Sequence, residues 1–494
     1  MLHPGRSGSP HMPKSGAQYL ASLQDGRQIF LDGGPVCDHV NHHAFRASIA
    51  SAAKMFDFQA TPENQSKMTF VSPKTGERVS RMWQLPTCYE GLVERRKALE
   101  AWAELSCGFL GRSPDHVASA LSAMYMGRHL FGERGERAVT DYYEFARDND
   151  LYLTYAIISP QADRSKSASE QSDEFLAAGV VDEDAEGITV RGAKMLATAV
   201  PMANEVMVAA IQPLKPGEEK YSFTAMVPLG AKGVKLLSRK SFEASALSAF
   251  DNPLSSAFDE NDCVLYLDDV KIPWSRVFVH SDIKLAQAQW HSTPAHVYQN
   301  YQCQIRLVVK MRFLLGLARK IAETNGIIEI PPVREILGQM AAETSMVQSM
   351  LEAMEITGTQ YGAYFVPNAS RLYPAMVLTQ QLYPKLIGQL RELSGGGMIM
   401  LPSSVNDFAN AEIAGLVAKT QRSPATDSKG RVKLFKLAWD AVGSEFGSRH
   451  LQYEMFYAGA NMVTRSHAFR TADWEASTGM VDRFMETYDL AGRK

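Results

Sequence analysis

Short segments rich in β-branched residues fill the middle of this 494-residue chain, over residues 151–280, and regions of helical pattern flank them on both sides. Segments such as YLTYAIISP, EVMVAAI and CVLYLDDVKIP are separated by Gly, Pro and Asp, as strands joined by turns are. The order helical, β, helical excludes a Rossmann fold, in which strands and helices alternate. The sequence also lacks the GxGxxG and GxxxxGKS/T motifs of nucleotide-binding loops.

We therefore predict the α+β class and four regions. These are a disordered tail (1–14), a mainly helical domain (15–150), a central β domain (151–285) and a C-terminal helical bundle (286–494). Within the second region, Asp32-Gly33-Gly34 is typical of the turn between two paired strands.

Two apolar patterns define the long helices. In ERRKALEAWAELSCGFL, apolar residues three to four apart predict one helix face: Leu99, Trp102, Leu105 and Phe109. A second seam alternates steps of three and four, which fits helix–helix packing: Leu337, Met340, Thr344, Val347, Leu351 and Met354. Such a seam is either a subunit interface or the inside of an intrachain bundle.

Composition narrows the functional classes. The chain is 45% hydrophobic and 21% charged, as ordinary globular proteins are, and its net charge of −3 argues against a nucleic-acid partner. The 5 cysteines show no CxxC pattern, which predicts free thiols in a reducing compartment. No apolar run is long enough for a membrane helix, and the polar N-terminus lacks a signal-peptide core. We predict a cytoplasmic protein without a membrane partner.

The motif GRSPDH places a guanidinium, Arg112, four residues before an imidazole, His116. Ser113 and Pro114 are typical of a helix start, with Ser as the cap and Pro at the first helical position. Both side chains would then lie near a helix N-terminus, which favours anions. The alternative is a pair of ordinary surface or capping residues.

Taken with several further stretches, this motif resembles the large component of two-component aromatic hydroxylases, the 4-hydroxyphenylacetate 3-monooxygenase family. The stretches are AIISPQADR (156–164), GAKMLAT (192–198), NPLSSAFDENDCVLYLDDVKIPW (252–274), MLPSSVNDF (400–408) and WDAVGSEFGSRHLQYE (439–454). The resemblance implies an acyl-CoA dehydrogenase-like fold. Its parts are N-terminal helices, a central β-barrel-like domain and a C-terminal four-helix bundle that builds homotetramers or homodimers.

The resemblance also implies a reaction. A separate NAD(P)H-flavin reductase supplies FADH2, which reacts with molecular oxygen to give a flavin C4a-hydroperoxide. That species hydroxylates a phenol ortho to its OH. Arg112 and His116 would hold the phenol oxygen as a phenolate, with the imidazole able to take the proton. Tyr155 and His296 would complete the catalytic pocket, and no metal is expected.

The chain departs from the family at two of these positions. Phenol hydroxylases of the family usually carry Tyr where this chain has His116, and His where it has Tyr155, so the two side chains look exchanged. If both side chains point into one pocket, we expect a substrate that differs in size or orientation from the phenol that most of the family binds. The expected substrate is therefore a 4-hydroxyphenylacetate-like phenol or a tyrosine-derived one, as in secondary metabolism.

For the flavin, the resemblance implies contacts along three segments. Arg164 and Arg449 suit a pyrophosphate, because a guanidinium binds phosphate oxygens in pairs. Thr198 would donate to the isoalloxazine edge. The alternative for each Arg is an ion pair. The full set is Tyr155, Ala156, Ile157, Gln161, Asp163, Arg164, Thr198, Ser444, Phe446, Gly447, Ser448 and Arg449.

Another relative of this fold is the iron–sulfur flavoenzyme 4-hydroxybutyryl-CoA dehydratase. His296 and Cys303 match the spacing of two of its cluster ligands, but Arg112 and His116 stand where its cysteine pair would be. An iron–sulfur cluster normally needs three or more thiolates, so a redox-neutral lyase is the alternative and not the leading function.

A non-catalytic scaffold of the same fold is the third hypothesis. His296 is either a pocket residue or an ordinary helix histidine.

Overall fold

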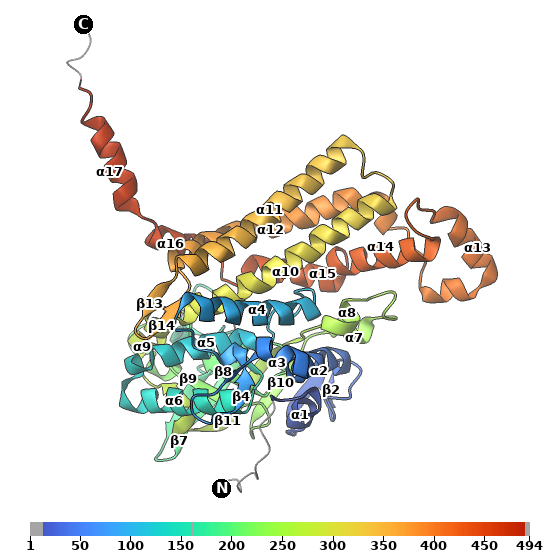
Figure 1. Ribbon diagram of the computed structural model, residues 1–494. Helices are drawn as coiled ribbons and strands as arrows, with labels where there is room; N and C mark the ends of the chain where they lie inside the picture. Colours follow the sequence, from blue (N-terminus) through green and yellow to red (C-terminus); the bar gives the residue numbers. More distant parts are fainter. Residues whose placement is uncertain (1–12, 161, 490–494) are drawn as a thin grey trace.

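The computed structural model describes residues 13–160 and 162–489 (Figure 1). Most of the predicted tail, residues 1–12, lies outside this description. Lys14 is held against the body of the protein, because its backbone N–H donates to the Asp150 carboxylate at 3.3 Å. The limits of the four predicted regions stay predictions.

The N-terminal part is mainly helical and contains the predicted hairpin. Strands β1 (Gln28–Leu31) and β2 (Gly34–Val36) pair antiparallel around Asp32 and Gly33, whose φ angles are 50° and 78°. Two successive positive φ values define a type I′ turn, which Asp-Gly favours. The helices and remaining strands are α1 (Gly16–Ser22), α2 (Arg46–Ala60), α3 (Pro62–Met68), β3 (Thr69–Val71), β4 (Arg78–Ser80), α4 (Tyr89–Leu105), α5 (Asp115–Met126) and α6 (Gly132–Asp148).

Helix α4 is shorter than its apolar spacing predicted. Leu99 and Trp102 are buried as expected, but the helix ends at Leu105, which is exposed. Cys107 and Gly108 then adopt positive φ, which an α-helix cannot continue through, so Phe109 reaches the core from the following turn.

Two sheets make up the centre. The 6-stranded sheet has the order β2-β1-β10-β11-β7-β6, and the 4-stranded sheet the order β12-β9-β8-β5. They contact each other through β5 with β7 and β9 with β11. Among the described residues they do not close into a barrel. The strands are β5 (Leu153–Ala156), β6 (Gly179–Glu183), β7 (Gly187–Thr198), β8 (Glu205–Ala209), β9 (Thr224–Pro228), β10 (Val234–Ser238), β11 (Asp262–Pro273) and β12 (Val277–Val279), with short helices α7 (Phe242–Ser245) and α8 (Ser255–Phe258) between β10 and β11.

The C-terminal part is a helical bundle above the sheets (Figure 1). Helices α10, α11 and α12 pack against one another, and α14 and α15 pack against this group. A small hairpin joins α11 to α12. The elements are α9 (Ile283–Ser292), α10 (Ala295–Thr324), α11 (Pro331–Ile356), β13 (Thr359–Tyr361), β14 (Tyr364–Val366), α12 (Ala369–Ser394), α13 (Ala411–Thr420), α14 (Ser428–Val442), α15 (Glu445–Phe456), α16 (Asn461–Thr471) and α17 (Trp474–Met485).

The apolar seam lies on α11 and faces the inside of the bundle. Met340, Val347, Leu351 and Met354 are buried within the chain, where α11 packs on α10 and α12. The seam is therefore an intrachain core and does not support a subunit interface. Assembly into a homotetramer or homodimer stays a prediction.

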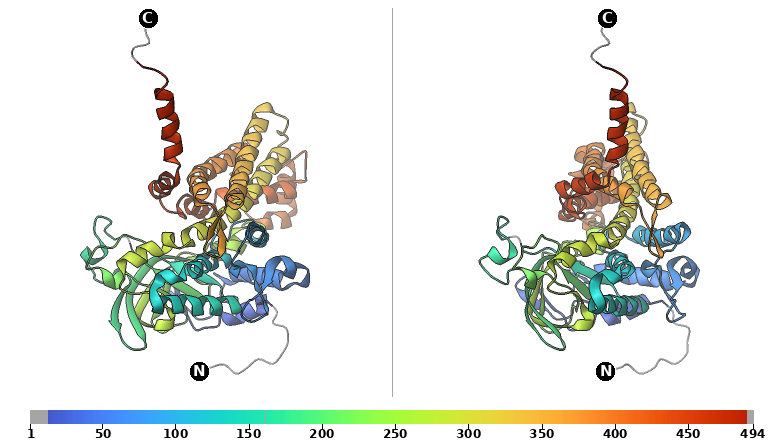
Figure 2. Two further views of the ribbon diagram at one scale, coloured as in Figure 1. Left: turned by 60° about the vertical axis from the view of Figure 1, so that its left-hand side comes forward. Right: turned by 90° about the vertical axis from the view of Figure 1, so that its left-hand side faces the viewer.

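Three further features concern helix α17, the length of the helices and the cysteines. Helix α17 extends away from the bundle in both views of Figure 2 and has no buried residue. Across the described part of the chain, no helix combines the length and apolarity needed to cross a bilayer. All 5 cysteines lie in the described part and are free thiols, as predicted.

Candidate active site

The GRSPDH turn connects α4 to α5 close to the bundle. Helix α5 begins at Asp115, one residue later than predicted, and no side chain caps its first turn. The predicted Ser113 cap is therefore wrong. The Ser113 hydroxyl instead accepts from the Gln302 amide at 3.4 Å, because α10 lies directly against α5.

The backbone of Arg112 is fixed on both sides. Its N–H donates to Glu260 Oε2 at 2.8 Å, and its carbonyl accepts from the Tyr152 hydroxyl at 2.6 Å. The preceding residue must be glycine, because a Cβ at Gly111 would lie 2.6 Å from the ring of Tyr453. These contacts fix where the Arg112 side chain enters the site.

The Arg112 guanidinium is buried between two aromatic rings. Its carbon lies 5.0 Å from the centre of the Tyr155 ring and 5.2 Å from that of Tyr453, within the range of cation–π attraction. Nη1 donates to Nε2 of His116. Burial alone would lower the pKa of Arg112, but Tyr155 and Tyr453 outweigh it and raise the pKa above its usual value. The group is a permanent cation.

His116 is completely buried. Burial lowers its pKa well below the usual value, and the cations Arg112 and Arg306 lower it further, so the ring is neutral near pH 7. Nε2 receives the Arg112 donor, and neutral imidazole carries one proton, so that proton belongs on Nδ1. Nδ1 has no hydrogen-bond partner among the described residues.

Tyr155, at the end of β5, lies beside His116. The ring centres are 5.2 Å apart, so the two side chains that look exchanged do share one site. Burial raises the pKa of Tyr155, although hydrogen bonds from Gln299 and Arg112 oppose the shift. Its phenol therefore stays protonated at neutral pH.

Sequence reasoning did not single out three residues of this site. Tyr453 covers Arg112, Gln299 lies 3.2 Å from His116 Nε2, and Glu260 holds the Arg112 backbone. Tyr453 and Glu260 fall inside stretches that carry the resemblance. No local pattern in the sequence singles out Gln299, which tertiary packing of α10 on α5 brings to His116.

His296 lies in a different cluster. Its ring is 4.5 Å from His291 and 4.8 Å from His467, and Nδ1 is 3.3 Å from the Tyr373 hydroxyl. No contact of the described residues joins it to Arg112, His116 or Tyr155. A catalytic role for His296 stays a prediction.

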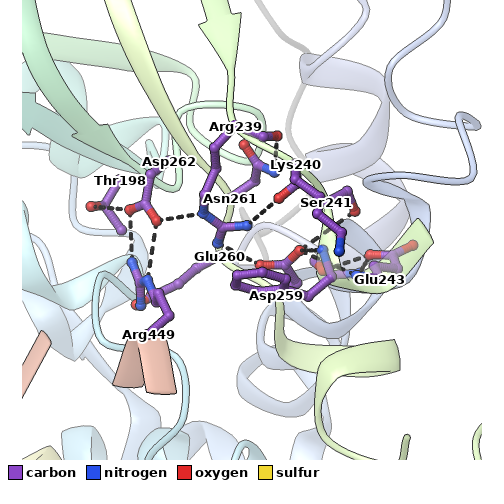
Figure 3. Close-up of polar contacts among 12 residues, drawn as sticks. Thr198, Arg239, Lys240, Ser241, Glu243, Asp259, Glu260, Asn261, Asp262 and Arg449 are labelled. Atoms are coloured by element: carbon purple, nitrogen blue, oxygen red, sulfur yellow. Dashed lines mark hydrogen bonds and ion pairs between the residues drawn. The ribbon is translucent and has the colours of Figure 1, made fainter. Parts of the chain in front are cut away.

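Arg449 and Thr198 belong to a network of buried carboxylates (Figure 3). Arg449 donates to Asp262 at 2.7 and 3.0 Å and to Glu260 at 2.8 Å. The Thr198 hydroxyl donates to Asp262 at 2.7 Å. The pKa of Asp262 is well below its usual range, because Arg449 and Arg239 outweigh the effect of burial. Glu260 joins this network to Arg112, and the flavin contacts of Arg449 and Thr198 stay predictions.

The segment after β5 lines a cavity of about 380 Å³. Arg164 faces it and has no hydrogen-bond or ion-pair partner among the described residues. Lys194 of β7 is 2% exposed, and Ser159 Oγ, at 3.4 Å, is the one hydrogen-bond partner of its Nζ in the described part of the chain. Burial lowers the pKa of Lys194 to about 8. Asp163 accepts from Ser165, while Gln161 lies outside the described residues.

The remaining predicted flavin positions lie at the end of β5 and at the start of α15. Ala156 and Ile157 continue from β5 and are buried. Ser444 caps α15 by accepting from Gly447 N at 3.1 Å, and Phe446 packs on His450. Ser448 is exposed.

Two family profiles together match most of the chain. The profile of the 4-hydroxyphenylacetate 3-hydroxylase N-terminal domain matches residues 15–279, and that of the C-terminal domain matches residues 286–486. The chain belongs to the 4-hydroxyphenylacetate 3-hydroxylase family. The predicted family is thus confirmed, and with it the enzyme class, a monooxygenase.

Individual family members match over almost the whole chain. The 4-hydroxyphenylacetate 3-monooxygenase oxygenase component of Pseudomonas aeruginosa is 33% identical, covering 97% of this chain and 94% of that protein. The pyoverdin chromophore biosynthetic protein PvcC of the same organism is 33% identical, covering 98% and 97%. A monooxygenase of Streptomyces globisporus, named for a carrier-bound 3-amino-3-(3-chloro-4-hydroxyphenyl)propanoyl group, is 30% identical over 99% and 94%.

Solved structures give the same result. The oxygenase component HpaB of 4-hydroxyphenylacetate 3-monooxygenase, complexed with FAD, superposes with a TM-score of 0.91 at 30% identity, covering 96% of this chain and 98% of that one. An archaeal 4-hydroxybutyryl-CoA dehydratase superposes with a TM-score of 0.87 at 20% identity over 97% and 96%, a likeness of fold alone.

Proposed function

We propose that this protein hydroxylates a phenol ortho to its OH, using reduced FAD and dioxygen, with the flavin supplied by a separate NAD(P)H-flavin reductase. The single observation that carries the proposal is the buried cluster at Arg112. A permanent cation that packs on two tyrosine rings lies there beside an imidazole whose N–H has no partner among the described residues. Such a cluster suits a phenolate oxygen, because both donors stabilise negative charge in a site shielded from water.

The cavity lined by the segment after β5 suits the phosphate groups of a flavin. Arg164 and Lys194 line it as cations that have no anionic partner among residues 13–160 and 162–489, and a buried amine without such a partner is costly. These two residues would hold the pyrophosphate, with Tyr155, Ala156 and Ile157 close to the ring system. When bound, reduced FAD supplies the electrons that activate dioxygen.

The residues around Arg112 act on the phenol. A free phenol has a pKa of about 10, and a nearby guanidinium favours the ionised form, which makes the ring carbon ortho to oxygen electron-rich. For His116 to donate to the same oxygen its ring has to turn, because Nδ1 and Nε2 point to opposite sides of the ring and Arg112 lies at Nε2. We infer that Tyr155 orients the substrate ring and helps exclude water.

The substrate class follows from these residues and from the relatives. We infer a 4-hydroxyphenylacetate-like phenol or a tyrosine-derived one. Relatives are named for 4-hydroxyphenylacetate, for 4-nitrophenol and for a chlorinated hydroxyphenyl amino acid on a carrier protein, and all three substrates are phenols. The exchange of His116 and Tyr155 supports a substrate that differs from simple 4-hydroxyphenylacetate.

The direct test is a panel of phenols incubated with the protein, FAD, NADH and a generic flavin reductase. Catechol formed from at least one phenol, and absent when FAD or the protein is omitted, is the expected result. Hydrogen peroxide without catechol from any free or carrier-bound phenol would contradict the proposal. Iron and sulfide in the purified protein would favour the lyase instead.

A further inference from the structure

Three histidines from three different helices meet outside the Arg112 cluster. His291 ends α9, His296 begins α10 and His467 lies on α16. One ring nitrogen from each lies within 4.8 Å of the others. Imidazole nitrogen is the commonest protein ligand for divalent transition metals, and three such ligands with one open position are a recurring zinc arrangement.

The imidazoles are in the form that binds metals. Burial lowers the pKa of all three, so each ring offers a lone pair at neutral pH. His467 is buried, whereas His291 is exposed at the end of its helix, which leaves a path from solvent. Zinc–nitrogen bonds of about 2.1 Å would need the nitrogens roughly an ångström closer, which requires rotations of all three side chains.

Neighbouring groups hold two of the rings by their Nδ1 atoms. The Tyr373 hydroxyl lies 3.3 Å from Nδ1 of His296, and Arg470 Nη2 donates to Nδ1 of His467 at 2.5 Å. The Tyr373 contact orients the His296 ring and leaves its Nε2 for a metal. The Arg470 contact instead places the His467 proton on Nε2, so metal binding there releases that proton to solvent and displaces the exposed Arg470 side chain. Arg470 also carries a positive charge, which opposes a cation, but its side chain is exposed and the repulsion is screened by water.

We propose that His291, His296 and His467 form a binding site for one divalent transition-metal ion of the zinc type, with water completing the coordination. The ion joins α16 to α9 and α10.

The test uses the full chain without a histidine tag, freed of metal by EDTA. Titration with Co²⁺ should give the visible absorption of a four-coordinate site at one ion per chain, and Zn²⁺ should displace it. His291→Gln, at an exposed position, and His467→Ala should each weaken binding by about a hundredfold or more, while circular dichroism stays unchanged.

Two variants separate this site from other surface histidines. His43→Ala, from an adjacent histidine pair far along the sequence, should bind Co²⁺ like the wild type. Arg470→Gln should tighten binding by roughly two- to tenfold, because it removes a nearby positive charge. Absence of one-to-one binding, or equal binding by His291→Gln and the wild type, overturns the proposal. Neither outcome bears on the hydroxylase function, since no flavin is present.

Discussion

Three side chains contact the Arg112 guanidinium. Tyr155 and Tyr453 lie on either side of the guanidinium, and His116 accepts one of its N–H groups. Because these side chains touch, substitutions among them should not act independently.

The exchange of His116 and Tyr155 can be reversed by substitution. His116→Tyr and Tyr155→His should each lose hydroxylation, whereas the double variant should recover activity on a simple phenol such as 4-hydroxyphenylacetate. We expect a coupling of about 0.5–3 kcal/mol between the two changes, because the rings are neighbours. The measurement is the kcat/KM of all four proteins on the same phenols. His116→Tyr combined with Tyr125→His is the control pair and should be additive; additivity of the first pair would show that the exchange is coincidental.

Because His116 is buried, the stability of the protein should depend on pH. The pKa of the folded state lies well below the usual value of about 6.5. Below pH 6.5 the unfolded chain therefore takes up a proton that the folded chain does not, and stability falls as pH falls, by up to about 1.4 kcal/mol per pH unit. Above pH 6.5 the contribution is constant. In urea denaturation, His116→Asn should lose stability less steeply than the wild type between pH 6.5 and 5. Equal slopes would contradict a buried neutral imidazole.

The sequence predicted part of this site. Arg112 and His116 are four residues apart, and a helix start brings such residues together. Tyr155 came only from the family resemblance, because nothing local links it to His116. Tyr453 and Glu260 are brought in by tertiary packing of α15 and of the turn before β11, which no local pattern encodes.

At the scale of elements, the order of helices and strands was predictable and their partners were not. Short β-branched segments between Gly, Pro and Asp indicated strands such as β11, and apolar steps of three and four indicated the seam of α11. The parallel pairing of β1 with β10 joins Gln28 to Lys235, a contact between segments too distant for sequence periodicity to reveal. The end of α4 was missed because positive φ at Cys107 is set by its surroundings.

The seam of α11 allows a test of the intrachain packing. Leu351 is 2% exposed, so Leu351→Ala should lower the free energy of unfolding by about 2–5 kcal/mol. Met346 on the same helix is 38% exposed, so Met346→Ala should cost under about 0.5 kcal/mol. Denaturant unfolding measures both, and light scattering should show the same molar mass for both variants and the wild type. A different molar mass for Leu351→Ala would show that the seam is part of a subunit interface.

For the whole molecule, we expect the purified protein to be nearly colourless and to bind reduced FAD far better than oxidised FAD. The sequence has no dinucleotide fingerprint, and it resembles enzymes that receive reduced FAD from a separate reductase. Gel filtration followed by an absorption spectrum, and anaerobic titration with FADH2, make the comparison. Stoichiometric yellow flavin after gel filtration would contradict this expectation.

The measurement that tests the central claim most directly is the coupling of Arg112→Ala, the ratio of catechol formed to NADH consumed. If Arg112 holds the phenol and the flavin chemistry belongs to the cofactor, this variant should consume oxygen and release hydrogen peroxide while catechol falls about a hundredfold or more. Arg137→Ala, which removes an exposed arginine paired with Glu133, should couple like the wild type. Wild-type coupling in Arg112→Ala would show that the phenol binds elsewhere.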